Sequence, residues 1–238
     1  MPPVTFWMLN ERREKDCVSI TTERKYFRVG NIWIKRNLRP AEWQIHPVNG
    51  NIIVPLFGKE RLQNEAATLQ YIARNTNIPI PKLIGSFEDD GAVHLITEHV
   101  EGVQMNELDQ DQRKKVEKEV EFHLQTLKKL CSAEWGGPSG IVIPPYRVIT
   151  DTFRPRWNMQ RRDSMDLVFC HNDLSTHNIL VDKDTLKINA ILDWEYAGFF
   201  PPQFEAEYFR RPGPSIALED EDDDVKKLVG ILQKCEAK

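Results

Sequence analysis

A short polar segment, VFCHNDLSTHNILVD at residues 168–182, lies between two apolar runs and carries several groups that can do chemistry. Asp173 is followed by Asn178 five residues later, and Asp193 comes fifteen residues after Asn178. One carboxylate can accept a proton from an attacking hydroxyl, while a second carboxylate and an amide oxygen can hold magnesium, which prefers oxygen ligands. The three side chains together are typical of a metal-assisted phosphoryl-transfer site.

A zinc site is the alternative interpretation of this segment, because His171 and His177 flank Asp173. Zinc in proteins is usually held by closely spaced His and Cys ligands. The four cysteines of the chain stand far apart without any CxxC spacing, which also argues against a disulfide framework. We therefore expect reduced thiols, and we favour packing and loop hydrogen bonds for both imidazoles.

The apolar runs on either side of the segment predict the elements that position its polar groups. Residues 167–169 and 178–181 are expected to be strands, and a turn at 182–185 leads to a third strand over 186–193. Asp193 closes that third strand. The ends of short strands therefore fix Asp173, Asn178 and Asp193 at one end of a small hairpin platform.

A second hairpin is predicted near the start of the chain, in KYFRVGNIWIKR. Gly30 and Asn31 suit a two-residue turn. The register that this turn implies pairs Phe27 with Ile34 and leaves Lys35 on the opposite face of the sheet.

Residues 57–75 show an apolar stripe at helical spacing, and Glu65 lies on that stripe. A carboxylate on a buried face is costly unless it is paired, so Glu65 requires a cationic partner, for which Lys35 is the candidate. The alternative is that Glu65 lies at the edge of the stripe and reaches water.

The remaining pattern divides the chain into a strand-rich first part and a helix-rich second part. Strands over 83–88 and 92–100 are joined by a turn, and an amphipathic helix follows over about 107–130. We expect a nucleotide-binding lobe over 1–100, a hinge at about 98–102, and a catalytic and substrate lobe over 101–238.

The composition narrows the possible partners and location. The net charge of −4 gives no overall basic field, so nucleic acid is not the expected partner. The apolar patch FWML near the start is too short for a signal peptide, and no run approaches the length of a membrane span. We expect a cytoplasmic protein that does not bind membranes, and no obligate protein partner is evident.

The motifs together resemble a known family. HNDLSTHN has the H-x-D-x4-N spacing of the kinase catalytic loop, and ILDWEYAGF looks like the metal-binding segment that follows it. With LITEHVEG, these stretches are similar to the aminoglycoside phosphotransferase and choline kinase group, and to its fungal members in particular. The resemblance implies a two-lobed protein-kinase-like α+β fold, with a small β-rich first lobe and a larger, mostly helical second lobe.

The resemblance also implies roles for the residues of the catalytic loop. Asp173 would be the catalytic base that orients and deprotonates the acceptor hydroxyl, with His171 beside it as a scaffold residue of the catalytic set. Asn178 and Asp193 would be the magnesium ligands.

For the first lobe, the resemblance implies a nucleotide site for ATP. Lys35 would contact the α and β phosphates and pair with Glu65, while the backbone from Glu98 to Val100 would hydrogen-bond the adenine edge. The acceptor would be a hydroxyl group on a small molecule. A protein substrate is not expected, because only 45 residues follow Asp193 and they contain no A-P-E segment.

The chain departs from the family pattern in one important respect, since residues 17–25, CVSITTERK, contain no glycine where a glycine-rich loop is expected. Backbone amides approach phosphates less closely without glycine. Two alternatives therefore stay open: a degenerate relative that binds a ligand or partner, and a cleft adapted to a non-phosphoryl reaction. The long stretch between Lys35 and Glu65 either folds over the cleft or extends the sheet.

The acceptor pocket is expected in the variable segment 131–166. Its arginines could grip an anionic acceptor or a nucleotide phosphate between aromatic walls, although such a basic stretch is more often a solvated loop. These residues are Arg147, Arg154, Arg156, Arg161 and Arg162, with Trp135, Tyr146, Phe153 and Trp157. An aminoglycoside is polycationic, so it is not the expected acceptor. The acidic run 219–224 is interpreted as helix capping and solvation.

Overall fold

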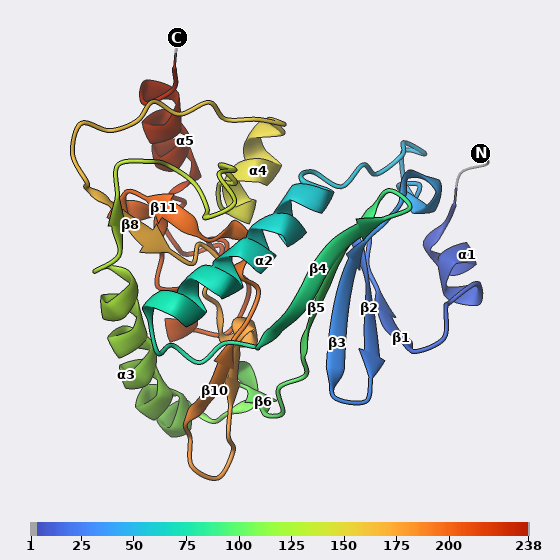
Figure 1. Cartoon of the computed structure of the whole chain (residues 1–238), viewed down its shortest axis with the longest axis horizontal. Helices are drawn as coiled ribbons and strands as arrows, with labels where there is room; N and C mark the ends of the chain where they lie inside the picture. Colours follow the sequence, from blue (N-terminus) through green and yellow to red (C-terminus); the bar gives the residue numbers. More distant parts are fainter. Residues whose placement is uncertain (1–3, 238) are drawn as a thin grey trace.

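The computed structural model describes residues 4–237, which form a five-stranded antiparallel sheet beside a larger part of helices, short strands and loops (Figure 1). The order of strands in the sheet is β1-β2-β3-β5-β4. A short helix, α1 (Phe6–Glu11), lies at its outer side (Figure 1). The strands are β1 (Cys17–Ile20), β2 (Arg24–Val29), β3 (Ile32–Asn37), β4 (Leu83–Asp89) and β5 (Ala92–Glu98).

The predicted β2–β3 hairpin is confirmed with its register. Phe27 faces Ile34 and Val29 faces Ile32 across the two strands. Gly30 has a φ of 58°, a left-handed conformation that glycine adopts without steric cost. The local turn therefore decides which face of the sheet carries Lys35.

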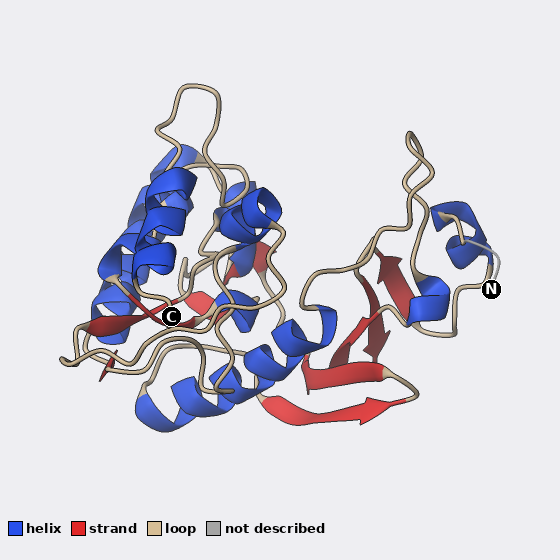
Figure 2. Ribbon diagram, turned by 90° about the horizontal axis from the view of Figure 1, so that it is seen from above, coloured by secondary structure: helices blue, strands red, loops and turns tan. Residues whose placement is uncertain are grey.

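Helix α2 (Gly58–Asn75) lies between the sheet and the larger part of the molecule, as both ribbon views show (Figures 1 and 2). Its buried face includes Leu62, Leu69 and Ile72, as the apolar stripe predicted. On the other side, Tyr71 stacks on Phe169 with the ring centroids 5.4 Å apart. Helix α2 therefore joins the two parts through a continuous core.

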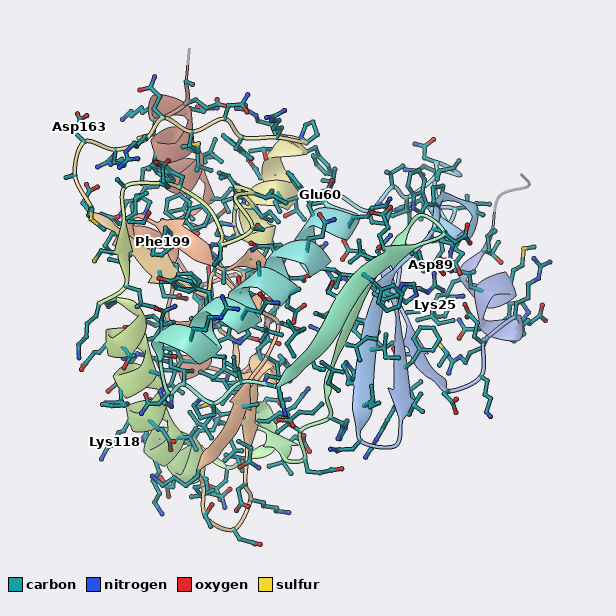
Figure 3. All side chains as sticks on the ribbon, in the orientation of Figure 1. Lys25, Glu60, Asp89, Lys118, Asp163 and Phe199 are labelled. Carbon is teal, nitrogen blue, oxygen red and sulfur yellow. The ribbon has the colours of Figure 1, made fainter. Side chains whose placement is uncertain are left out.

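The larger part contains three α-helices, several short 3₁₀ helices and two three-stranded sheets, with strand orders β10-β9-β6 and β11-β8-β7. The helices are α3 (Gln110–Leu127), α4 (Tyr146–Thr152) and α5 (Val225–Lys234). The strands are β6 (Val103–Gln104), β7 (Cys131–Ser132), β8 (Leu167–Cys170), β9 (Ile179–Val181), β10 (Ile188–Ile191) and β11 (Gly198–Phe200). Lys118 extends from the outer face of α3, as expected for a solvated helix side (Figure 3).

The three strands predicted around the polar segment are all present, but β10 ends at Ile191, so the prediction that Asp193 closes this strand is wrong. β9 and β10 form the expected hairpin, with Ile179 opposite Ile191. β8 belongs instead to the other small sheet, between β7 and β11. The polar segment therefore crosses from one sheet to the other rather than joining two strands of one platform, because β8 pairs with residues that follow Asp193.

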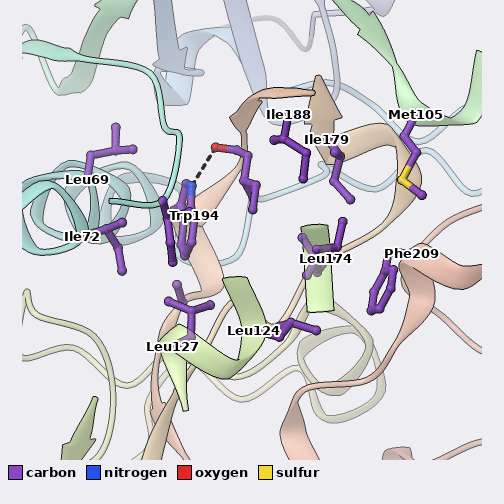
Figure 4. Close-up of a cluster of buried hydrophobic side chains, with 14 of the residues drawn as sticks. Leu69, Ile72, Met105, Leu124, Leu127, Leu174, Ile179, Ile188, Trp194 and Phe209 are labelled. Carbon is purple, nitrogen blue, oxygen red and sulfur yellow. Dashed lines mark hydrogen bonds between the residues drawn. The ribbon is translucent and has the colours of Figure 1, made fainter. Parts of the chain in front are cut away.

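The core beneath the site brings helices α2 and α3 together around Trp194 (Figure 4). Leu69 and Ile72 from α2 and Leu127 from α3 share a cluster with this indole, which is fully buried. The indole N–H donates to the carbonyl oxygen of Ile191 at 2.8 Å. Trp194 therefore anchors the chain directly after Asp193 in the interior.

The long stretch after Lys35 extends the sheet region and does not cover the cleft. It contains the short 3₁₀ helix η1 (Pro40–Glu42), and Gln44 forms a bridge with Val4. Trp43 packs against a small cluster that includes Leu9 and Leu38. We propose that the boundary between the lobes lies at about 98–102, where β5 has ended and β6 has not begun.

Within residues 4–237 no helix is both long enough and apolar enough to cross a membrane. The four cysteines are free thiols.

Candidate active site

His171 fixes the beginning of the polar segment. Its side chain is fully buried, and burial lowers the pKa of the imidazole to about 4, so the ring is neutral at physiological pH. Nε2 lies 2.8 Å from the carbonyl oxygen of Leu192, and Nδ1 accepts a hydrogen bond from the backbone N–H of Asp173 at 3.2 Å. One imidazole therefore holds the loop against the end of β10, which is a scaffold arrangement.

Asp173 and Asn178 are tied together within the loop. The Asn178 amide Nδ2 donates to the Asp173 backbone carbonyl at 2.8 Å and to its carboxylate Oδ2 at 3.1 Å. Burial raises the pKa of the Asp173 carboxyl to about 6, although the nearby Ser215 hydroxyl and the Asn178 amide favour the carboxylate. A carboxylate with such a pKa is suited to accept a proton near neutral pH.

Lys35 joins the sheet, helix α2 and the segment after β10. Its Nζ lies 2.7 Å from Oε1 of Glu65 and also pairs with the carboxylate of Asp193. Glu65 is only 3% exposed, so the predicted ion pair is confirmed and the water-exposed alternative is wrong. Burial opposes the charge of Lys35, but Asp193 and Glu65 raise its pKa above the usual value.

Asp193 adopts a left-handed backbone conformation with φ 59° and ψ 53°, which is uncommon for a residue with a side chain. Such strain persists only where the surroundings hold it, here the buried Trp194 that follows. Burial opposes ionisation of Asp193, but the Lys35 ammonium lowers the pKa of this carboxyl below its ordinary value.

A cavity of about 770 Å³ opens between the five-stranded sheet and the larger part of the molecule. Its walls include Lys35 and Asp193 at one end and the backbone region 98–102 at the other. Tyr26 and Trp33 line the sheet side, with ring centroids 6.0 Å apart. Asn178 also lines the cavity, and through it Asp173 is joined to the cavity wall.

The backbone at the hinge end of the cavity is partly engaged within the protein. The N–H of Glu98 donates to the Lys82 carbonyl and that of His99 to the Asn31 carbonyl, both at 2.9 Å. These two N–H groups are therefore not available to an adenine. If this backbone binds an adenine edge, it does so through its carbonyl oxygens and the N–H of Val100.

The donor atoms available near Asp193 fit magnesium. The Asn178 amide directs Nδ2 to Asp173, which leaves Oδ1 available, and the Asp193 carboxylate uses Oδ1 for Lys35. One amide oxygen and one carboxylate are the hard ligands that magnesium takes from a protein when phosphates and water complete its shell.

The segment that carries these polar side chains is similar to a known protein family. Residues 143–217, about a third of the chain, match the phosphotransferase enzyme family, and they include Asp173, Asn178 and Asp193. The predicted resemblance to the aminoglycoside phosphotransferase family is confirmed.

Two curated relatives of this phosphotransferase-like chain are similar over part of their length. The aminoglycoside 3'-phosphotransferase of Streptomyces ribosidificus is 28% identical over 153 residues, which cover 56% of this chain and 58% of the relative. An uncharacterised kinase-like protein of Caenorhabditis elegans is 34% identical over 86 residues, which cover 35% of this chain and 22% of that protein. The matches therefore span less than two thirds of either relative.

Solved structures support the fold. The crystal structure of aminoglycoside phosphotransferase APH(4)-Ia aligns with a TM-score of 0.52 and 16% identity, over 84% of this chain and 73% of that one. A thermostable mutant of the same enzyme, solved with ADP and hygromycin B, aligns with a TM-score of 0.51 and 15% identity, over 85% and 74% of the two chains. The predicted protein-kinase-like α+β fold is confirmed.

The arginines of segment 131–166 are mostly paired within the phosphotransferase-like fold. Arg147 is buried and binds Asp224 at 2.8 Å, Arg161 binds Glu134 at 2.6 Å, and Arg154 and Arg162 pair with Glu236 and Asp166. The buried Arg147 is therefore not available to an anionic acceptor, whereas the pairs of Arg154, Arg161 and Arg162 are at least partly exposed, so for these three the hypothesis stays a prediction. The alternative of a solvated loop is confirmed for residues 153–166, which are mostly exposed loop, but not for Arg147, which is buried in α4.

Arg156 lines a separate cavity of about 510 Å³ together with Trp135 and Trp157. This cavity and the one that contains Lys35 share no lining residues. Tyr146 and Phe153 are exposed, at 44% and 69%. The variable segment thus forms a pocket, but not one that opens at Asn178 and Asp193.

The acidic run 219–224 does more than solvate a helix end. Asp223 accepts a hydrogen bond from the backbone N–H of Val225, the first residue of α5, at 3.0 Å, whereas the N-cap residue Asp224 makes no side-chain cap. Asp224 holds Arg147, whose Nη2 also donates to the carbonyl of Phe204 at 3.1 Å.

Three charged residues near the site were not identified from the sequence. Arg24, at the start of β2, pairs with Glu195, and Arg61 of α2 binds the same carboxylate at 2.7 Å. All three are at least 95% buried. Arg61 could have been suspected, since it lies four residues before Glu65 on one helix, but no local pattern connects Arg24 to Glu195.

Proposed function

We propose that the chain is an ATP- and magnesium-dependent phosphotransferase that acts on a hydroxyl group of a small molecule. The observation that carries this proposal is the convergence of Lys35, Asn178 and Asp193 on one cavity, with Asp173 hydrogen-bonded to Asn178. The match to the phosphotransferase family over residues 143–217 supports the reaction class. We further propose a cytoplasmic location; the similarity to fungal members stays a prediction from sequence.

Nucleotide would lie along the cavity with its base at the hinge. The carbonyls of residues 98–100 and the Val100 N–H would meet the adenine edge, and Tyr26 and Trp33 would provide apolar contact. Lys35, held by Glu65, would contact the α and β phosphates. The thermostable APH(4)-Ia mutant solved with ADP supports a nucleotide in this fold.

Asp173 would act on the acceptor. The acceptor oxygen bonds to the γ phosphorus, the bond between that phosphorus and the bridging oxygen of ADP breaks, and the hydroxyl proton passes to the Asp173 carboxylate. Asn178 and Asp193 would hold magnesium, which supplies positive charge that neutralises the phosphates. The Asn178 amide, which donates to the Asp173 carboxylate, would hold it in place.

A binding protein without catalytic activity is the second candidate, and one observation favours it. Backbone N–H groups in the β1–β2 turn, where a glycine-rich loop would contact phosphates, are hydrogen-bonded to Thr21. Consumption of ATP with and without magnesium, measured against a panel of small hydroxyl compounds, separates the two. Turnover with any compound supports the enzyme, and MgATP binding without turnover supports the binding protein.

A further inference from the structure

Most backbone amides of the turn between β1 and β2 are engaged within the turn itself. The backbone N–H of Thr21 donates to the Arg24 carbonyl at 2.8 Å, closing the hairpin. The Thr21 hydroxyl then accepts from the N–H groups of Glu23 at 3.2 Å and Arg24 at 3.0 Å. Three amides of the turn, those of Thr21, Glu23 and Arg24, are therefore already bonded, so fewer backbone donors are available to a phosphate than in a glycine-rich loop.

The pairing of the strands shows that Arg24 lies farther from the hinge than Lys35 does. Ile32 pairs with Glu98 at the hinge, Lys35 pairs with Tyr26 further along, and Arg24 pairs with Asn37 two residues later. Two residues of a strand span about 7 Å. A nucleotide with its base at the hinge and its first phosphates at Lys35 would extend its last phosphate past Tyr26, which lines the cavity, toward Arg24, which lies on the same face of β2 but is not itself a lining residue.

Arg24 is held in position by an ion-pair cluster. Its guanidinium, in a residue only 3% exposed, pairs with Glu195, and Arg61 binds the other oxygen of that carboxylate at 2.7 Å. Arg61 also binds Glu23 in the turn at 2.9 Å. Among residues 4–237, no group accepts a hydrogen bond from the buried Nε of Arg24.

We propose that Arg24 binds the terminal phosphate of the nucleotide and replaces the backbone amides of a glycine-rich loop, with Glu195 and Arg61 holding it in place. A guanidinium has five N–H donors in a fixed plane, so it can keep its bond to Glu195 and still donate to phosphate oxygens. This inference rests on the proposed function, since it requires a nucleotide in the cavity.

The test compares the affinities of MgATP, MgADP and adenosine for wild type and Arg24→Gln. We expect Arg24→Gln to weaken MgATP binding by roughly tenfold to a hundredfold, the usual range for a charge-assisted hydrogen bond, and MgADP binding by less than threefold. Adenosine affinity should stay the same. Arg24→Lys should recover part of the loss, because an ammonium keeps the charge without the planar fork.

Arg28→Gln is the matched control, since Arg28 lies on the same strand and its exposed side chain pairs with Glu101 at 2.9 Å. It should leave the ratio of MgATP to MgADP affinity unchanged. Thermal unfolding without nucleotide checks that Arg24→Gln folds, which we expect because Arg61 still neutralises Glu195.

Equal losses of MgATP and MgADP affinity, or no loss, in folded Arg24→Gln would overturn the Arg24 assignment and leave the proposed function standing. Failure of the wild-type protein to bind either nucleotide would overturn both.

Discussion

The Lys35 ammonium and the Glu65 carboxylate lie 2.7 Å apart and join strand β3 to helix α2 in the wall of the cavity. The same ammonium pairs with Asp193, which comes from the larger part of the molecule. One lysine thus connects three separate segments, so the arrangement of the cavity and the stability of the fold depend on it together.

Glu65→Gln should lower the free energy of unfolding by about 3 kcal/mol, because it removes one partner of a buried ion pair. We place the loss at the lower end of the usual range, since Lys35 keeps Asp193 as a partner. Urea denaturation measures the change. Glu101→Gln, which breaks the exposed pair with Arg28, should cost at most about 1 kcal/mol. Equal losses in the two variants would contradict a buried, stabilising pair.

Asp173→Asn should reduce turnover by about a hundredfold to ten-thousandfold while nucleotide affinity changes little. The amide keeps the size of the side chain but cannot accept the proton of the acceptor hydroxyl. Initial rates of ATP consumption and nucleotide affinity are measured in parallel. Asp184→Asn, at an exposed position in the β9–β10 turn, should behave as wild type. Full activity in Asp173→Asn would rule out its role as the base.

Asp193→Ala should abolish the dependence of nucleotide binding on magnesium and leave the protein folded. The variant removes one of two proposed ligands, and Lys35 stays neutralised by Glu65. The measurement is the affinity for ATP, once in excess magnesium and once in the presence of a chelator. The two affinities should differ for wild type and be equal for the variant. A variant whose affinity still rises with magnesium would show that Asp193 is not a ligand.

Glu205→Gln should change how stability depends on pH. Burial raises the pKa of the Glu205 carboxyl from the usual 4.5 to about 7, and this carboxylate accepts the backbone N–H of His171. Between these pH values the folded protein keeps a proton that the unfolded chain has released, so wild-type stability falls as pH rises from about 4.5 to about 7. The loss is at most about 3 kcal/mol.

Glutamine at this position does not titrate, so the variant should gain stability relative to wild type as pH rises, and the difference should become constant above about pH 7.5. Unfolding free energies of both proteins at pH 5 and pH 8 test this. The same difference at both pH values would mean that Glu205 is ionised normally in the folded state.

The parts of this structure that follow from local chemistry could be predicted from the sequence. Gly30 and Asn31 define a turn whose register depends on nothing outside the hairpin, so the face of Lys35 followed from it. The Glu65 prediction needed only the helical period and the cost of an unpaired buried charge. The H-x-D-x4-N spacing likewise predicted that Asp173 and Asn178 belong to one site, and their side chains are hydrogen-bonded.

Features that depend on distant segments could not be predicted in this way. Arg24 and Glu195 are 171 positions apart, and only the packing of the β1–β2 turn against the segment after Asp193 brings them together. Arg147 and Arg154 looked available because their acidic partners, Asp224 and Glu236, lie far along the chain. The sheet to which β8 belongs could not be predicted for the same reason, because its partner strand β11 begins 28 residues after β8 ends.

The hydrogen bonds of the Thr21 turn also bear on the entropy of ligand binding. A glycine-rich loop is mobile when empty and loses conformational freedom when it closes over phosphates. The turn held by the Thr21 hydroxyl has lost that freedom during folding, so a ligand beneath it binds to a preorganised surface. Calorimetry of MgATP binding should therefore show a larger unfavourable entropy for Thr21→Gly than for wild type. In the wild-type protein, the rigid turn would keep the same conformation each time a ligand binds and leaves.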